Sequence, residues 1–279
     1  GSEDFTVRGG SIGRAESTKR YRIAELALQE RIPLVMLLEG AGHRPPLPND
    51  PPTTRTPGDL QAQAEASGKI PFVAAVLGPS AGHGALSAPL ADFSIMTEKA
   101  SIFTAGPPLV KASLGEDITK EELGGPTVAL QSGVIHNLVH GDEEALSQVK
   151  RWLSYLPSSA WEHPPKAEPS TGKRRVEELL DIIPDNPRHS YDMKNVIQVI
   201  MDEESFFEIQ PIFGASLITG FARLGGRSVA IVANQPQHLA GSINVDAADK
   251  ATQFIQVADA FHMPLIFLTD NPGVLAGSA

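Results

Sequence analysis

The chain contains an internal repeat, which restricts its possible folds more than any other feature of the sequence. Residues 10–42 align with residues 241–273 at a constant offset of 231, without a gap. The positions identical in both copies are Gly10, Ser11, Ile12, Lys19, Ala27, Pro33, Leu34, Leu37 and Gly42. Chance similarity rarely keeps one register over such a length. We therefore expect one structural module to be present twice.

Each copy has the pattern of a helix followed by a buried strand. Residues 20–29 carry apolar side chains at helical spacing, as do Phe254 and Ala258 in the second copy. A proline then ends the helix and opens an apolar run, at residues 33–38 and again at 264–268. Such runs are typical of strands buried on both faces of a parallel sheet. The pattern predicts an α/β fold of βαβ units.

Glycine-containing turns follow both strands, at residues 39–42 and 270–273. In open α/β sheets, ligands bind beyond the carboxyl ends of the strands. The functional residues are therefore expected in these turns.

Prolines cluster between the two copies. Residues 157–190 contain Pro157, Pro164, Pro165, Pro169, Pro184 and Pro187, together with the basic run Lys173-Arg-Arg175. Such composition indicates a connecting segment. We predict an N-terminal domain at 1–160, a proline-rich connection at 161–190, and the start of a C-terminal domain at 191–279.

Composition excludes several classes of function. The chain has no cysteine, which rules out disulfides, iron–sulfur clusters and cysteine nucleophiles. Its net charge of −10 argues against binding to nucleic acid. No apolar run approaches the roughly 18 residues of a membrane span, and no export signal is visible. We expect a cytoplasmic protein, or one of the mitochondrial matrix if the source is eukaryotic.

A second glycine-rich turn, at residues 78–84, follows the apolar run at residues 70–77. A turn between a strand and a helix start leaves backbone N–H groups without partners, and its small residues allow a ligand oxygen to approach. Two convergent N–H groups stabilise an enolate or oxyanion. The turn is thus a candidate oxyanion hole.

Two other interpretations of this turn stay open. Gly78, Ser80 and Gly82 match the Gly-x-Ser-x-Gly pattern of serine hydrolases, with Ser80 as the nucleophile. In the second interpretation, residues 78–84 form a tight turn that has no chemical role. A Walker A loop is excluded because no Gly-Lys-Ser/Thr follows the glycines.

The sequence resembles the carboxyltransferase (beta) subunits of biotin-dependent acyl-CoA carboxylases, which belong to the crotonase-like superfamily. The matching stretches run the length of the chain in family order: Asp4-Phe-Thr-Val-Arg-Gly-Gly-Ser11, Gly78-Pro-Ser-Ala-Gly82, Asp92-Phe93, Glu121-Glu-Leu-Gly-Gly125, Ser132-Gly133, Ser205-Phe-Phe-Glu208, Thr219-Gly-Phe-Ala-Arg223, Val232-Ala-Asn-Gln-Pro236, Ala247-Ala-Asp-Lys250 and Asp270-Asn-Pro-Gly273. The resemblance implies tandem crotonase-like domains, the second incomplete in this chain. It also implies a chain longer at both ends, and the repeat places the counterpart of residues 78–84 near 309–315.

The resemblance also implies the reaction and its participants. A separate biotin carrier brings N1-carboxybiotin to a site between two subunits, and the carboxyl group moves to the α-carbon of an acyl-CoA thioester through an enolate. The carrier belongs to a biotin carboxylase and biotin carrier subunit. The enzyme is expected to be a homo-oligomer, a dimer-based hexamer in this family, with no metal. A biotin-dependent acyl-CoA decarboxylase subunit is the alternative within the superfamily.

Site residues follow from the matching motifs. The first oxyanion hole falls on the N–H groups of Gly82 and His83, with Gly42 in the neighbouring turn. The second falls on the backbone of Gly273 and Val274. Contacts to CoA or substrate are expected at Ala41, Ala81 and Arg44, although Arg44 also suits a surface ion pair.

The chain departs from the family pattern at His43 and His83. The family usually has Ser-Gly-Gly-Ala-Arg where this chain has Glu39-Gly-Ala-Gly-His-Arg44, and glycine where His83 stands. Backbone donors survive such changes, but the shape of the pocket does not follow from the resemblance.

Other polar residues receive simpler interpretations. His136 and His140 have the i, i+4 spacing of a metal-binding pair but lack a third ligand, so no metal site is predicted. Lys19 and Lys250 are interpreted as solvated lysines at helix starts, with a shared role in ligand binding as the alternative.

Overall fold

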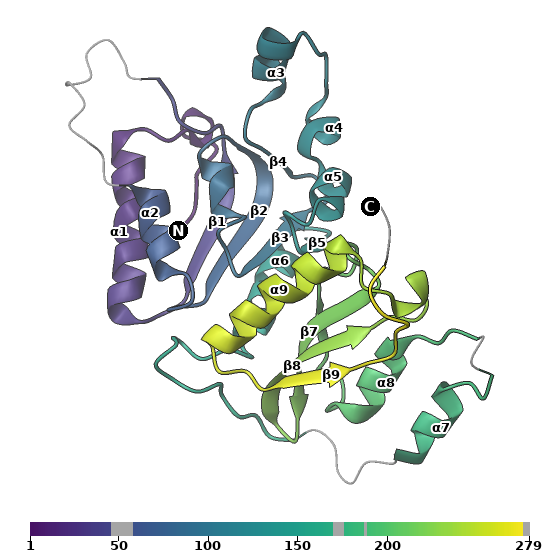
Figure 1. The fold of residues 1–279 in the computed structure, drawn as a ribbon. Helices are drawn as coiled ribbons and strands as arrows, with labels where there is room; N and C mark the ends of the chain where they lie inside the picture. Colours follow the sequence, from purple (N-terminus) through teal and green to yellow (C-terminus); the bar gives the residue numbers. More distant parts are fainter. Residues whose placement is uncertain (46–57, 170–175, 187–188, 276–279) are drawn as a thin grey trace. The chain divides into compact units, whose positions relative to one another are not determined.

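The computed structural model describes residues 1–45, 58–169, 176–186 and 189–275. These residues form two compact units, Gly1–Arg151 and Trp152–Ala279 (Figure 1). The domain boundary at 161–190 stays a prediction, and the basic run 173–175 lies outside the described residues. No helix of the described segments is long and apolar enough to cross a membrane.

The first unit is built on a parallel sheet. Its strands are β1 (Leu34–Gly40), β2 (Phe72–Ala81), β3 (Phe93–Thr97), β4 (Ser101–Phe103) and β5 (Asn137–Val139), in the order β1-β2-β3-β5 with β4 also paired to β2. All pairs are parallel, as predicted for this part of the chain. The helical elements are η1 (Arg8–Gly10), α1 (Arg14–Glu30), α2 (Asp59–Ala66), η2 (Gly84–Ser87), α3 (Pro107–Leu114), α4 (Lys120–Gly124), α5 (Pro126–Gln131) and α6 (Asp142–Leu153).

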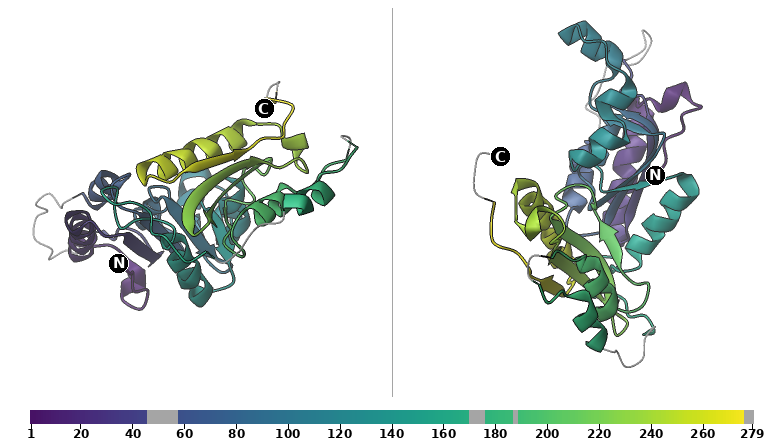
Figure 2. Two further views of the ribbon diagram at one scale, coloured as in Figure 1. Left: turned by 90° about the horizontal axis from the view of Figure 1, so that it is seen from below. Right: turned by 90° about the vertical axis from the view of Figure 1, so that its right-hand side faces the viewer.

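The core of the first unit lies between the sheet and two helices. α1 and α2 lie side by side (Figure 1 and Figure 2). Their buried alanines belong to one hydrophobic cluster with residues of β1 and β2. Residues 72–76 of β2 are fully buried, as the apolar run predicts. β1 instead alternates between buried and half-buried positions, so the prediction of burial on both faces is wrong for this strand.

The second unit has a mixed sheet, in the order β6-β7-β8-β9. Its strands are β6 (Phe207–Ile209), β7 (Leu217–Leu224), β8 (Arg227–Asn234) and β9 (Leu265–Leu268), and its helical elements are η3 (Val176–Glu178), α7 (Leu179–Ile182), α8 (Met193–Ile200), η4 (Leu239–Gly241) and α9 (Val245–Ala260). α8 packs on the face of β7 that carries Ile218, whereas Phe254 of α9 contacts Phe221 on the other face.

The hairpin of β7 and β8 departs from the predicted βαβ pattern. These strands are antiparallel, and only β8 and β9 pair in parallel. Gly225 and Gly226 connect them with φ of 60° and 75°, the geometry that a two-residue hairpin turn of this type requires. Two consecutive glycines between two β-forming runs would therefore have predicted an antiparallel hairpin here.

The backbone confirms the repeat at the same offset of 231. η1, α1 and β1 begin at residues 8, 14 and 34, and η4, α9 and β9 begin at 239, 245 and 265. Both helices are followed by a left-handed residue, Arg31 with φ of 55° and His262 with φ of 57°. Isolated parallel bridges join Ile12 to His43 and Ile243 to Val274. The two modules thus share their turns as well as their helices and strands.

The structural repeat begins earlier than the sequence repeat. Glu3 Oε2 accepts a hydrogen bond from Glu39 N at 2.8 Å, and Asn234 Oδ1 accepts one from Asp270 N at 3.3 Å. Both pairs are related by the offset of 231. A carboxylate and an amide therefore perform the same structural role, which residue identity does not reveal.

Lys250 contradicts its interpretation as a solvated residue. It is 1% exposed, and its Nζ donates to the carbonyl oxygens of Gln210, Phe213 and Leu217 at 2.6–3.0 Å. Burial lowers the pKa of its ammonium to about 8. The group therefore remains charged at neutral pH and donates all three hydrogen bonds. Its counterpart Lys19 is exposed, as expected.

Replacing Lys250 with methionine is expected to lower the free energy of unfolding by about 3 kcal/mol, because three buried carbonyl oxygens lose their donor. Urea denaturation measures the change. The matched control is Lys19→Met at the exposed counterpart, expected to change stability by less than about 0.5 kcal/mol. Equal effects of the two substitutions would contradict a structural role for the buried ammonium.

Candidate functional site

Two strand-end turns of the first unit lie against each other. Gly42, after β1, has φ of 79°, and a Cβ placed on it would lie 2.8 Å from the Ala81 carbonyl oxygen. A Cβ on Gly82, after β2, would lie 3.6 Å from Gly42 Cα. Glycine is therefore required at position 42 both by the backbone conformation and by the close approach. The turns at 41–43 and 81–84 come together as the sequence predicts.

The backbone donors differ in part from the prediction. Gly82 N donates to Phe103 O at 2.9 Å, so the assignment of Gly82 as a free donor is wrong. Its N–H instead joins the turn to the end of β4. The His83 N–H has no acceptor among the described residues and precedes the short helix η2.

A second unpaired amide is found at His43. Ile12 N donates to Gly42 O at 2.7 Å, and Arg44 N donates to Ile12 O at 3.0 Å. The residue between two such bonds of a parallel ladder directs its own N–H to the other side. The His43 N–H accordingly has no acceptor in the described part of the chain. The two unpaired amides come from one turn each.

An apolar cavity of about 250 Å³ begins at Ala85, the residue that follows the turn at 81–84. Its walls come from η2, β4, α4 and α5, and include Leu86, Phe103, Gly124, Val128 and Ala129. The Phe103 carbonyl that binds Gly82 connects the cavity wall to the turn. The sequence does not reveal this cavity, because its walls come from separate segments of the chain.

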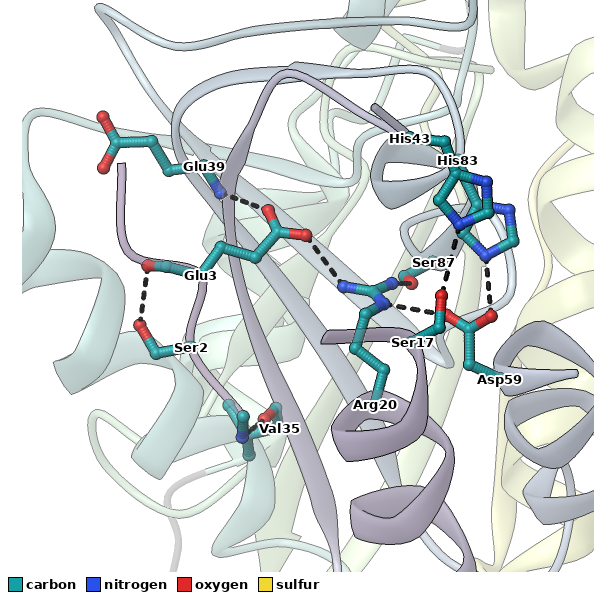
Figure 3. A network of polar contacts seen from close by, with 11 residues as sticks. Ser2, Glu3, Ser17, Arg20, Val35, Glu39, His43, Asp59, His83 and Ser87 are labelled. Atoms are coloured by element: carbon teal, nitrogen blue, oxygen red, sulfur yellow. Dashed lines mark hydrogen bonds and ion pairs between the residues drawn. The ribbon is translucent and has the colours of Figure 1, made fainter. Parts of the chain in front are cut away.

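A buried polar network supports the two turns (Figure 3). His83 Nε2 lies 2.7 Å from Asp59 Oδ1, and Arg20 Nε donates to Asp59 Oδ2 at 2.8 Å. Arg20 also donates to Glu3 at 2.8 Å and to Ser87 Oγ at 2.7 Å. All the groups that bind Arg20 are themselves buried or nearly so. The network thereby fixes the position of Asp59.

Burial and charge act against each other in this network. Burial raises the pKa of Glu3, although the Arg20 charge opposes this. Burial alone would also raise the pKa of Asp59, but hydrogen bonds from His83 and Arg20 outweigh it and lower that pKa to about 2. Asp59 is therefore ionised at neutral pH.

The remaining predicted residues are placed as follows. Ala41 and Ala81 lie in the two turns, and Ala41 N donates to Gly9 O. Arg44 donates to Ser11 O at 2.8 Å and to Glu16 Oε2 at 3.0 Å, so a CoA phosphate would have to compete with Glu16.

Ser80 is fully buried in β2, and its Oγ has no hydrogen-bond partner. Ser80 therefore lacks the hydrogen-bonded base that the hydrolase alternative requires of it.

The two histidines of the i, i+4 pair face different surroundings. His136 is buried and accepts a hydrogen bond from Ser94 N, whereas the exposed His140 pairs with Glu98. No group of three or more His, Asp or Glu residues that could hold a metal is found within the described segments.

The second predicted site lies in the second unit. Ile243 N donates to Gly273 O at 3.1 Å, and Leu275 N donates to Ile243 O at 2.9 Å, which repeats the ladder of the first unit. The N–H of Val274 has no acceptor in the described ranges, and Val274 is exposed. Val274 is thus the counterpart of His43.

Comparison with known proteins agrees with this architecture. The carboxyl transferase domain family matches residues 1–279. The chain is 38% identical to the propionyl-CoA carboxylase carboxyltransferase subunit of Haloferax mediterranei, covering 99% of this chain and 54% of that protein. It is 35% identical to methylmalonyl-CoA decarboxylase subunit alpha of Veillonella parvula, covering 99% of this chain and 55% of that protein. The chain thus spans about half the length of these relatives.

A solved structure of transcarboxylase 12S, described as a hexamer with hydrolysed methylmalonyl-CoA bound, matches with a TM-score of 0.90 at 37% identity. The match covers 98% of this chain and 54% of that one. It confirms the predicted α/β, crotonase-like fold. The chain belongs to the carboxyl transferase domain family.

Proposed function

We propose that this protein is the carboxyltransferase component of a biotin-dependent acyl-CoA carboxylase. The observation that carries the proposal is the pair of unpaired amides, His43 N–H and His83 N–H, on two abutting turns beside an apolar cavity. Family membership supports it, as do relatives that are named carboxylase subunits. Carboxybiotin, brought by a separate carrier subunit, supplies the carboxyl group and the base.

The two amides would bind the thioester carbonyl oxygen of the acyl-CoA. As the α-proton leaves, this oxygen becomes negative, and hydrogen bonds to it strengthen most when water is excluded. The adjoining cavity provides apolar walls for this purpose. The chain's own contribution is therefore to hold the enolate, and no side chain need act as the base.

The apolar cavity would receive the acyl group. Its volume of about 250 Å³ lies below the roughly 300–1,000 Å³ of pockets that enclose whole drug-sized ligands. It therefore suits part of the acyl chain rather than the CoA moiety.

Shortening a side chain of the cavity wall should change the preferred acyl length. Leu86→Ala is expected to raise the ratio of kcat/KM for a longer acyl-CoA over a shorter one by about tenfold, since each added methylene in an apolar pocket contributes about 1–3 kcal/mol. Leu114→Ala is the control, because this exposed residue of α3 lies outside the cavity wall. An unchanged ratio in Leu86→Ala would place the acyl group elsewhere.

The second site, at Gly273 and Val274, would bind the ureido oxygen of biotin through backbone amides. The repeat of the ladder around Ile12 and Ile243 supports this, because it gives both turns the same unpaired amide. We further propose a biotin carrier subunit as partner and a dimer-based hexamer as the assembly. The hexameric transcarboxylase 12S supports the latter.

The decarboxylase alternative is favoured by the likeness to methylmalonyl-CoA decarboxylase subunit alpha. The same amides would then stabilise the enolate that is left when a carboxyacyl-CoA gives its carboxyl group to biotin, before the α-carbon takes up the proton that biotin N1 releases.

Labelled carboxybiotin tests the proposal. The assembled protein is expected to transfer label from carboxybiotin to one or more of a panel of short and long acyl-CoAs. Label moving only from a carboxyacyl-CoA to biotin would instead support the decarboxylase, and no transfer in either direction would contradict both.

A further inference from the structure

The imidazole rings of His43 and His83 stack on each other. Their centroids are 4.2 Å apart and their planes differ by 12° (Figure 3). His43 belongs to the turn after β1 and His83 to the turn after β2. The stack therefore links the two turns whose amides we assign to the thioester oxygen.

Each ring is also attached to a different helix. Ser17 Oγ of α1 lies 3.3 Å from His43 Nε2, and Asp59 Oδ1 of α2 lies 2.7 Å from His83 Nε2. Asp59 is held by Arg20 through its other oxygen. The positions of both rings, and hence of both turns, depend on these anchors.

The charged groups that face the pair restrict how it can titrate. Asp59 contacts His83, and Arg20 pairs with Asp59 and with Glu3. Arg44 is instead paired with Glu16. Burial, and then the charge of His83, lower the pKa of His43. Two charged rings at 4.2 Å would repel each other, so the stack suits at most one charge.

We propose that His43 and His83 are positioning residues, which hold the two donor turns together through their stacked rings and release them when both rings are protonated. This inference rests on the proposed function, because it assigns the turns to the thioester carbonyl. It predicts that the rate of carboxyl transfer decreases at acidic pH because both imidazole rings of the pair become protonated.

The test compares His43→Ala with His43→Phe, which keeps an aromatic ring but cannot be protonated. His43→Ala is expected to lower kcat by at least about tenfold, with a smaller effect on KM, since small misplacements of reacting groups cost rate steeply. His43→Phe should recover part of that loss. The control is His140→Ala, a histidine exposed on the surface and paired with Glu98.

The pH profile separates positioning from a merely structural role. The wild-type protein is expected to show an acid limb in kcat below the ordinary histidine pKa, and His43→Phe should lack this limb. An acid limb that persists in His43→Phe would overturn the proposal. So would a kcat for His43→Ala equal to that of His140→Ala.

A second measurement does not depend on transfer. In an NMR titration of the histidine ring protons, the midpoint of His43 is expected to rise in His83→Asn, because the neighbouring charge is gone while a partner for Asp59 remains. If the wild-type protein shows no transfer, the proposed function fails and this titration alone decides on the pair. An unchanged midpoint of His43 would overturn the coupling.

Discussion

His83→Pro is expected to lower kcat for carboxyl transfer by about 100- to 1,000-fold relative to His83→Ala, as for the loss of one oxyanion donor. Both substitutions remove the imidazole, but only proline removes the backbone N–H. The φ of His83 is −58°, which proline adopts without strain. The comparison therefore isolates the amide from the ring.

The control for this prediction is stability. Because both variants lose the hydrogen bond to Asp59, their free energies of unfolding should be similar. Equal kcat values for His83→Pro and His83→Ala would show that the amide of residue 83 does not bind the reacting oxygen.

Gly42→Ala is expected to lower kcat/KM for transfer by about 100-fold, because a methyl group here forces the two turns apart by a fraction of an ångström or more. The added Cβ would lie 2.8 Å from the Ala81 carbonyl oxygen, and both groups belong to the backbone of the site. Steady-state kinetics with the preferred acyl-CoA measures the effect.

The matched control is Gly115→Ala at the end of α3. Gly115 has φ of 77°, close to the 79° of Gly42, but a Cβ there would meet no atom within 4 Å. Both variants carry the strain of a left-handed alanine, of order 1–3 kcal/mol. Transfer at the wild-type rate in Gly42→Ala, or equal losses in both variants, would mean that the close approach of the turns is not needed.

The sequence predicted the elements that depend on local pattern. The repeated helix, strand and turn are found at the offset of 231, because apolar periodicity, the prolines and the glycines act within about thirty residues. The same pattern placed Gly42, His83 and Gly273 in turns that follow strands, whereas their roles in the site, and that of Val274, came from the family resemblance. The glycine pair at 225–226 was an equally local signal for the hairpin, and it was missed.

Other features depended on tertiary contacts that the sequence does not display. Gly82 N–H is taken by Phe103 O, which is brought to the turn by the pairing of β2 with β4. Asp59 and His83 lie 24 residues apart, and Asp59 and Arg20 lie 39 apart. The burial of Lys250 depends on carbonyl groups of a preceding loop and of β7. In each case the partner is determined by packing of distant segments.

The most direct measurement is the infrared carbonyl stretch of an acyl-CoA labelled with carbon-13 at its thioester carbonyl and bound to the assembled protein. If the N–H groups of His43 and His83 donate hydrogen bonds to this oxygen, the carbonyl stretching frequency falls on binding. The decrease should be smaller in His83→Pro, which lacks one of the two donors. A carbonyl frequency equal to that of the free acyl-CoA in water would contradict the account, and so would an equal frequency shift in His83→Pro and in the wild-type protein.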